Sequence, residues 1–411
     1  MMDESREHVH GAAAAGVVGE VVLGGRGRRR LLSGHPWIFR DDVARSDAPP
    51  GAIARILAPQ GELLGHGAWS AASKIAVRLV ARGPRPLGPD FWTRRVAQCV
   101  ARRAKMGLLE PSGACRLVAG DADGFPGLVV DRYADVLVVQ SGTLAGDLLR
   151  ERVVAALAAQ LEFPLRAVLD RSDASARKLE GLEKRVELVQ GALEGEVVVE
   201  EAGLSYSVDV RAGHKTGHYL DQRDNRREAA RHARGASVLD AFCYDGLFGV
   251  RAALAGARRV LCLDQSEAAL ERTRANAERN GVLHLVATER VDCMDDLRER
   301  VQRGERHGLV IVDPPAFAKN RAAVAGAARG YVELNRRAFG LVEDGGVVVS
   351  ASCSYNIRAS DFYDHVREGA QAAGVEARVL ASHGAAPDHS VLLGLPESDY
   401  LKCVFCLADR P

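Results

Sequence analysis

The stretch 237–280 constrains the fold of this chain more than any other part, because short apolar runs alternate in it with loops and helical patterns. Residues 238–240 (Val-Leu-Asp) predict a strand that ends on an aspartate, and a turn leads from it into a helix over 248–254. A second apolar run, 260–263, also ends at an aspartate and precedes a long helix. This order indicates the first half of an α/β sheet of the nucleotide-binding type.

The loop after the first strand argues against a dinucleotide. A dinucleotide fold needs G-x-G-x-x-G so that the backbone can approach a pyrophosphate, but the bulky Phe242 and Tyr244 stand in this turn. S-adenosylmethionine has no phosphate, and its ribose suits an acid at the end of the second strand, Asp264. We therefore expect S-adenosylmethionine to contact Asp240, Phe242, Gly246 and Asp264. The alternative is an ordinary βαβ unit whose acids cap turns.

Two later strands are expected to bring further chemistry to the same place. The apolar run 309–312 leads into Asp313-Pro-Pro, and the run 346–351 leads into Ser-Cys353-Ser. Strands of a parallel sheet carry their catalytic and ligand-binding residues at their carboxyl ends. We expect the acids that end the first two strands to converge with Asp313 and Cys353 on one rim.

Composition sets wider bounds. A chain of 411 residues with 47% hydrophobic content predicts about two or three domains with cores. The net charge of +1 gives no bulk signal for a nucleic-acid partner. The polar start and the lack of a run of about 18 apolar residues predict a soluble, cytoplasmic protein without membrane contact. Eight scattered cysteines fit a reducing compartment, and the pair Cys403 and Cys406 is interpreted as part of a strand, with no metal site expected.

The pattern divides the chain into four parts. Residues 1–18 are predicted to be a disordered tail, and 19–82 a small β-rich, barrel-like domain. Residues 83–210 predict a linker, a helix and a central α+β domain without a catalytic constellation, in which the charged segment 170–184 is expected to face solvent. Residues 211–411 hold the α/β domain.

The β-rich domain carries a basic cluster beside aromatic residues. Arg28, Arg29 and Arg30 lie close in sequence to Trp37. Charge for phosphates and flat rings for bases are what a single-stranded or irregular RNA surface needs. The alternative is a solvated basic turn next to core aromatics.

The polar segment 211–235 is predicted to be a substrate-facing loop followed by a helix from about Asp221. Tyr219 could stack on an adenine, while Lys215 and Arg223 could meet a carboxylate or a phosphate. Alternatively, Asp221 only caps the helix and its arginines face water.

Several motifs occur in a fixed order behind GHPWIF: HKTGHYLDQRDNR, LDAFCYDGLFG, DPPAFAKN, GYVELN at 330–335 and SCS at 352–354. Together they resemble the large-subunit ribosomal RNA methyltransferase I family, from about Val21 to the end of the chain. The resemblance implies an N-terminal PUA domain, a central α+β domain and a C-terminal class I (Rossmann-like) methyltransferase domain. It also implies that the chain methylates C5 of a cytosine in 23S ribosomal RNA.

The resemblance assigns the nucleophile to Cys353. Cytosine C5 is too weak a nucleophile to take a methyl group directly, so a thiolate first adds to C6. Asp313 is expected to hydrogen-bond the N3/N4 edge of the base. Asp313 and Asp292 are both expected to contact the cofactor. Cys243 lies too near the predicted methionine pocket to reach C6, and Cys262 lies inside an apolar strand.

The cofactor loop departs from the family pattern, which keeps other functions open. The cofactor loop reads Tyr-Asp245-Gly-Leu247-Phe where Tyr-Thr-Gly-Gly-Phe is expected, which narrows the loop and adds an acid. Ala316 after Asp-Pro-Pro leaves only one thiol for the reaction. The alternatives are a methyltransferase on another RNA base or a small molecule, without a thiol adduct, and a non-catalytic RNA-binding assembly factor. An exposed sheet edge near 401–407 could mediate a homodimer.

Overall fold

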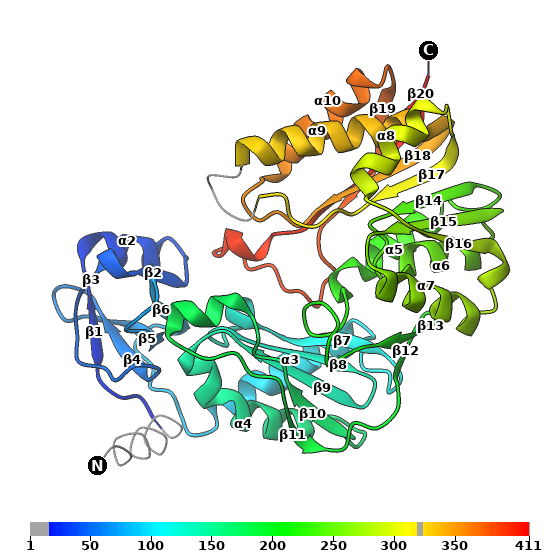
Figure 1. The fold of residues 1–411 in the computed structure, drawn as a ribbon. Helices are drawn as coiled ribbons and strands as arrows, with labels where there is room; N and C mark the ends of the chain where they lie inside the picture. The colour runs from blue at the N-terminus through cyan, green and yellow to red at the C-terminus, as the bar shows by residue number, and fades with distance from the viewer. Residues whose placement is uncertain (1–15, 319–323, 411) are drawn as a thin grey trace. The chain divides into compact units, whose positions relative to one another are not determined.

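The computed structural model describes residues 16–318 and 324–410, so most of the tail predicted at 1–18 lies outside the described residues (Figure 1). The chain forms two compact units. The first comprises Met1–Val199, Val208–Leu220 and Pro387–Ser398. The second comprises Glu200–Ser207, Asp221–Ala386 and Asp399–Pro411.

The first unit begins with a six-stranded sheet in the order β2-β6-β5-β4-β1-β3. Its strands are β1 (Glu20–Leu23), β2 (Trp37–Phe39), β3 (Val43–Ser46), β4 (Ile53–Leu57), β5 (Leu63–Trp69) and β6 (Ile75–Arg82). Leu23, Ile38 and Val77 are fully buried in its core. The alternation of apolar residues therefore gave the β-rich class correctly.

The basic cluster of this domain lies on a helix, α2 (Gly25–Leu32), and not in a β run or turn as predicted. Arginine and leucine favour helices, whereas the three glycines at 24, 25 and 27 suggested a turn. An eight-residue helix is marginal in isolation. Packing decides the outcome here, because Leu31 is buried while the neighbouring Leu32 stays exposed.

The central part of the first unit is a five-stranded sheet in the order β11-β10-β9-β8-β7, with helices α3 and α4 packed together. The elements are α3 (Phe91–Lys105), β7 (Ala114–Ala119), β8 (Leu128–Tyr133), β9 (Val136–Ser141), α4 (Leu144–Ala158), β10 (Ala167–Asp170) and β11 (Glu187–Gly191). This mixture of helices and strands agrees with the α+β class predicted for the region, and the five residues of β11 are exposed and show no apolar pattern. The hairpin β12 (Val197–Glu201) and β13 (Leu204–Val208) follows.

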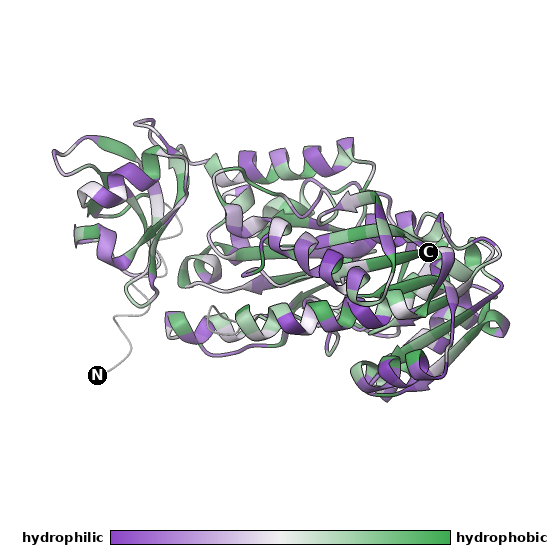
Figure 2. Cartoon of the chain, turned by 90° about the horizontal axis from the view of Figure 1, so that it is seen from above, coloured by the Kyte–Doolittle hydropathy of each residue, from purple (hydrophilic) through white to green (hydrophobic). Residues whose placement is uncertain are grey.

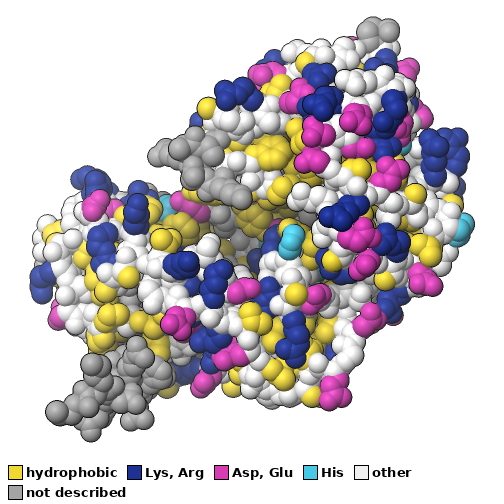
Figure 3. Space-filling model, in the orientation of Figure 1, with side chains coloured by type: hydrophobic (Ala, Val, Ile, Leu, Met, Phe, Trp, Pro, Cys, Tyr) yellow, Lys and Arg dark blue, Asp and Glu magenta, His cyan; other side chains and the backbone are white. Residues whose placement is uncertain are grey.

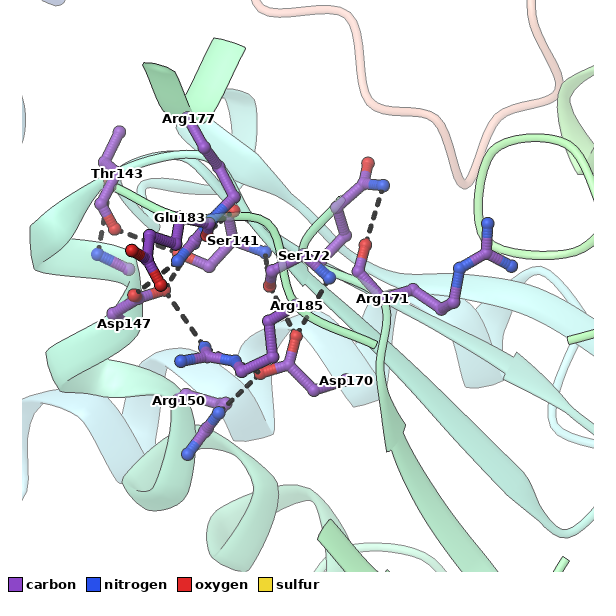
Figure 4. A network of polar contacts seen from close by, with 12 residues as sticks. Ser141, Thr143, Asp147, Arg150, Asp170, Arg171, Ser172, Arg177, Glu183 and Arg185 are labelled. Atoms are coloured by element: carbon purple, nitrogen blue, oxygen red, sulfur yellow. Dashed lines mark hydrogen bonds and ion pairs between the residues drawn. The ribbon is translucent and has the colours of Figure 1, made fainter. Parts of the chain in front are cut away.

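The charged segment 170–184 faces solvent only in part: Lys178, Glu183 and Lys184 are exposed as the sequence predicted, whereas Asp170, Arg171 and Arg177 are buried. Asp170 is fully buried, and Arg177 is 2% exposed. Arg177 donates two hydrogen bonds, of 2.8 and 3.0 Å, to the carboxylate of Asp147. The carboxylate of Asp170 accepts hydrogen bonds from Arg150 and from Arg185, the latter at 2.8 Å (Figure 4). Pairing of opposite charges allows Asp170 and Arg177 to be buried.

The second unit contains a seven-stranded sheet in the order β16-β15-β14-β17-β18-β20-β19. Its strands are β14 (Ser237–Ala241), β15 (Arg259–Asp264), β16 (Val286–Arg290), β17 (His307–Val312), β18 (Val342–Ser352), β19 (Glu376–His383) and β20 (Lys402–Asp409). The first five are mutually parallel, and β20 is antiparallel to both of its neighbours. The predicted α/β fold is confirmed.

Helices cover both faces of this sheet (Figure 1). One face carries α8 (Cys293–Gln302), α9 (Val324–Leu341) and α10 (Ala359–Ala372), which share a hydrophobic core with the strands. The other carries α5 (Arg223–Ala230), α6 (Leu247–Leu254) and α7 (Glu267–Arg279). The strands are largely hydrophobic, while the helices alternate hydrophilic and hydrophobic residues (Figure 2), as expected of a buried parallel sheet.

The apolar stretch 401–407 does not form a sheet edge. It belongs to β20, which lies between β18 and β19, and β19 is the outer strand. The sequence order misled the prediction, because the last strand of the chain inserts between two earlier ones. Among the described residues, no helix has both the length and the hydrophobicity needed to cross a membrane.

Candidate active site

The central strands of the second unit end together and carry acids at their carboxyl ends. In the parallel register, Ala241 of β14 pairs with Leu263 of β15 and with Val312 of β17. Asp264 and Asp313 each stand one residue beyond those partners, at the same edge of the sheet. The structure therefore brings these two aspartates to the strand ends next to Asp240, as the sequence predicted.

Asp240 is a buried carboxyl group, 1% exposed. Burial, together with the nearby charges of Asp313, Asp245 and Asp264, raises its pKa to about 8. The backbone N–H of Gly249 donates a 2.9 Å hydrogen bond to it. Gly249 was not singled out from the sequence, yet a Cβ there would meet the Sγ of Cys262 at 2.6 Å, so glycine permits this close approach.

Asp264 organises the loop between β14 and α6. Its carboxylate accepts hydrogen bonds from the backbone N–H groups of Tyr244 at 3.0 Å and Ser266 at 2.9 Å. Phe242, Tyr244 and Gly246 have φ values of 62°, 54° and 72°. Two non-glycine residues in the left-handed region within three positions are a concentration of backbone strain of the kind found at binding sites.

The two unusual residues of this loop are both buried. Asp245 is 5% exposed and interacts electrostatically with the guanidinium of the buried Arg226. Leu247 is the first residue of α6 and is 2% exposed. Gly246 between them is required, because a Cβ on it would meet Thr273 Cγ2 at 2.3 Å. The domain interior thus accommodates both departures from the expected loop.

The carboxyl groups at this edge of the sheet suit S-adenosylmethionine. Among the described residues, neither Asp240 nor Asp264 forms an ion pair with an arginine or lysine. Asp292 follows β16 and caps α8, where its carboxylate accepts a 3.2 Å hydrogen bond from Asp295 N. Carboxylates without cationic partners can accept hydrogen bonds from ribose hydroxyls and stabilise a positive sulfonium, but they would repel a pyrophosphate.

The predicted residues of the segment 211–235 divide between the two units. Lys215 and Tyr219 belong to the first unit, where the Lys215 ammonium lies 4.4 Å from the centroid of the Tyr219 ring. Arg223 belongs to the second unit and is buried in α5, with its Nε 3.5 Å from Asp224 Oδ1. Cofactor contacts of these three residues remain predictions.

The alternative interpretation, in which Asp221 caps the helix, is wrong. Helix α5 starts at Arg223, and Gln222 occupies the capping position. Asp221 lies in a short 3-10 turn and accepts a 2.6 Å hydrogen bond from the hydroxyl of Tyr400.

Asp313 is held by a polar chain that the sequence analysis missed. Gln222 Nε2 donates a 2.8 Å hydrogen bond to Asp313 Oδ2, and Asn225 Nδ2 donates a 2.6 Å hydrogen bond to Gln222 Oε1. Both side chains are buried. Their presence in the HKTGHYLDQRDNR motif was the only signal, because no local pattern links them to a strand end 91 residues away.

Cys353 stands directly after β18 and is partly exposed, whereas the other seven cysteines are buried. Burial raises the pKa of Cys293 and of Cys406 to about 12. Such thiols stay protonated and inert at neutral pH. Cys243 and Cys262 are buried as well, so exposure also favours Cys353.

Tyr331 and Lys402, which the sequence analysis did not single out, hydrogen-bond the two serines on either side of Cys353. The Tyr331 hydroxyl shares a 2.8 Å hydrogen bond with Ser354 Oγ and accepts one of 2.8 Å from Ser352 Oγ. Lys402 Nζ donates to the backbone oxygen of Ser354 at 2.8 Å. The thiol therefore lies between two anchored serines, and Tyr331 belongs to the GYVELN motif, which was a usable signal.

The predicted RNA-binding residues lie on and near α2 in the first unit. Arg28 and Arg30 form ion pairs with acidic residues at 3.6 and 3.7 Å, while Arg29 is exposed. The Trp37 ring lies under the guanidinium of Arg78, at 5.1 Å. Two of the three arginines are thus partly neutralised, and their contact with RNA remains a prediction.

Known proteins resemble this chain over nearly its whole length. Residues 21–82 match the PUA-like domain family, and residues 183–380 match the S-adenosylmethionine-dependent methyltransferase family. A protein of Aeromonas hydrophila named ribosomal RNA large subunit methyltransferase I is 39% identical over 387 residues, which cover 92% of this chain and 96% of the relative. A protein of the same name from Shewanella amazonensis is 40% identical over 387 residues.

Solved structures share the fold. A protein of Streptococcus mutans described as a SAM-dependent methyltransferase has a TM-score of 0.80 at 20% identity, covering 94% of this chain and 99% of its own. Another methyltransferase structure, complexed with SAH, has a TM-score of 0.81 at 21% identity and the same coverage. With its PUA-like domain, its acid-lined strand ends and these relatives, the chain belongs to the S-adenosylmethionine-dependent ribosomal RNA large subunit methyltransferase I family.

Proposed function

We propose that this protein transfers a methyl group to C5 of a cytosine in 23S ribosomal RNA, and that Cys353 is its nucleophile. One observation carries the proposal: the partly exposed cysteine of the chain follows β18, at the same end of the sheet as the acids of β14, β15 and β17. The names of the curated relatives support a large-subunit ribosomal RNA substrate.

The reaction requires the thiol for a chemical reason. Attack of the Cys353 thiolate on C6 forms an S–C6 bond and moves electron density to C5, which becomes enamine-like. S-adenosylmethionine supplies an electrophilic methyl group. After C5 has gained the methyl, a base removes the C5 proton, the S–C6 bond breaks, and the thiolate is released.

Asp313 is proposed to orient the cytosine. Its carboxylate can accept a hydrogen bond from the N4 amino group or, when protonated, donate one to N3 as negative charge develops on the ring. Gln222 fixes one carboxylate oxygen, Oδ2, by its 2.8 Å hydrogen bond. Pre-organisation of this kind limits the loss of freedom when the base binds.

A covalent trap tests the proposal. RNA that contains 5-fluorocytosine cannot lose a proton from C5 after methyl transfer, so the adduct should persist as a denaturant-resistant complex that maps to Cys353. The complex should need S-adenosylmethionine. Methylated product without any complex would point to another RNA base or acceptor, whereas cofactor and RNA binding without product would point to a non-catalytic assembly factor.

The carboxylate of Asp264 should dominate cofactor affinity. Asp264→Asn keeps the side-chain size but removes the charge that binds two backbone N–H groups and would bind the ribose. Loss of a charge-assisted hydrogen bond should raise the Kd for S-adenosylmethionine by roughly 10- to 100-fold, as measured by isothermal titration calorimetry. As a control, Glu271→Gln removes an exposed charge from α7 and should leave the Kd unchanged. An equal Kd in both variants would show that Asp264 does not contact the cofactor.

The basic residues of α2 should contribute to RNA affinity. Figure 3 shows Lys and Arg side chains interspersed with Asp and Glu on the visible face, in keeping with the net charge of +1. Local contacts to phosphates must then provide the salt-dependent part of binding.

The test is a triple variant of the full chain, Arg28→Gln, Arg29→Gln and Arg30→Gln. The slope of log Kd against log salt should fall by up to about three, roughly one for each lost phosphate contact. A matched control neutralises three exposed arginines of the second unit, Arg298, Arg303 and Arg367. Equal slopes for the two triple variants would show that α2 does not contact RNA.

A further inference from the structure

The ammonium group of Lys402 is buried beside the proposed nucleophile. Lys402 is 6% exposed and stands opposite Ser352 in the antiparallel pairing of β18 and β20. Its Nζ donates hydrogen bonds to the backbone oxygens of Ser354 at 2.8 Å and Tyr400 at 2.9 Å. Both partners are neutral, and among the described residues Lys402 forms no ion pair with a carboxylate.

A buried cation without an anionic partner is costly, because burial removes the water that stabilises its charge. Burial lowers the pKa of Lys402 to about 8, while the charges of Cys353 and Asp399 act to raise it. The interaction between Lys402 and Cys353 is reciprocal: if the thiolate stabilises the ammonium, the ammonium stabilises the thiolate to the same extent.

We propose that Lys402 is a positioning residue whose ammonium holds Cys353 in its thiolate form, with Tyr331 fixing the serines on either side of the thiol. This inference rests on the proposed function, in which Cys353 is the nucleophile. The arrangement gives a reason for burying a lysine in an otherwise apolar strand, since Cys403, Val404 and Phe405 follow it in β20. Placing the cation on a strand also fixes its position relative to the end of β18.

Other groups near the thiol do not supply the same charge. Tyr331 of α9 is buried, which raises its pKa and keeps the phenol neutral. The ring of His365 in α10 stacks on the ring of Tyr331, with centroids 6.2 Å apart. Asp313 at the end of β17 and Asp399 before β20 are carboxylates, which oppose thiolate formation. Lys402, in contrast, carries a positive charge that favours the thiolate.

Alkylation by iodoacetamide measures the thiolate directly, without RNA or cofactor. Cys353 is the partly exposed cysteine, and Cys353→Ala gives the background from the seven buried ones. Lys402→Gln keeps an N–H donor for the backbone oxygens but removes the charge, whereas Lys402→Arg keeps the charge. In the glutamine variant the pH profile of alkylation should shift upward by about one unit, with a roughly tenfold lower rate at pH 7.

The arginine variant should retain the wild-type profile more closely. A merely structural role predicts no difference between the two variants, because glutamine would then be tolerated as well as arginine. Identical profiles for wild type and Lys402→Gln overturn the inference. If neither variant folds, the wild-type profile still decides: a midpoint below the ordinary thiol value of about 8.5 supports the inference, and one at or above it overturns it.

Failure of this inference can be told apart from failure of the proposed function. The alkylation profile reports the effect of Lys402 on the thiol, whereas the 5-fluorocytosine trap reports whether the thiol attacks RNA. A shifted profile without a covalent RNA complex would retain the lysine–thiolate pair and reject the cytosine mechanism. A covalent RNA complex with an unshifted alkylation profile would retain the cytosine mechanism and reject the lysine–thiolate pair.

Discussion

Cys353→Ala should reduce methyl transfer to unmodified 23S ribosomal RNA by at least about 10³-fold, because no other group can form the bond to C6 that activates C5. The remaining cysteines are buried and cannot substitute for it. The measurement is transfer of labelled methyl from S-adenosylmethionine, with bisulfite sequencing to locate the product. The wild-type protein should label one cytosine.

The matched control is Cys99→Ala, which removes a buried thiol from α3 in the first unit and should retain activity. Circular dichroism and cofactor binding should be unchanged in the Cys353 variant, since its side chain is partly exposed. A folded Cys353→Ala protein that still methylates RNA would rule out the thiol mechanism. If the wild type also transfers no label, the loop with Asp245 and Leu247 becomes the reason to pursue a binding factor without catalysis.

Asp170→Ala should lower the free energy of unfolding of the first unit by about 3–5 kcal/mol. The substitution removes the fully buried carboxylate that accepts hydrogen bonds from Arg150 and Arg185, and it leaves both cations without this partner (Figure 4). The cost arises because the N–H and the hydroxyl of the buried Ser172 also lose their acceptor, while the closest acidic partners that the two arginines keep among the described residues are Asp147 and Glu187. Urea unfolding followed by circular dichroism measures the shift.

The control for this prediction is Glu151→Ala on α4. Its side chain is 85% exposed, although it lies 3.8 Å from the same Arg150. An exposed pair contributes little, so the control should change stability by less than about 1 kcal/mol. Similar stability of the two variants would mean that the Asp170 network is well hydrated, contrary to its burial in the structure.

Local patterns were sufficient for the central strands β14, β15 and β17 of the second unit. The strands ending at Asp240, Asp264 and Asp313 were predicted because a parallel strand buried on both faces is a short apolar run, and such runs are visible in sequence. The position of the acids followed from the same rule, since all parallel strands end at one edge. The loop chemistry then favoured S-adenosylmethionine over a dinucleotide.

Patterns that depend on distant partners were not readable in the same way. The helix α2 forms because Leu31 packs into the β-rich domain. Asp170 and Arg177 of the segment 170–184 are buried because their charges find partners 20 and 30 residues away. The position of β20 between β18 and β19 is a property of the sheet order and not of its own residues.

The sequence by itself determined the α/β class and the acids at the strand ends, because each depends on residues that are near one another in the chain, and the family resemblance of its motifs gave Cys353 as the candidate nucleophile. Only the tertiary structure showed that Gln222 holds Asp313 and that Lys402 lies against the residues flanking Cys353. The two hydrogen-bonded pairs, Gln222–Asp313 and Lys402–Ser354, are separated by 91 and 48 residues, and folding alone brings them within hydrogen-bonding distance. Electrostatic control of a reactive group depends on such distances in space, which no local pattern encodes.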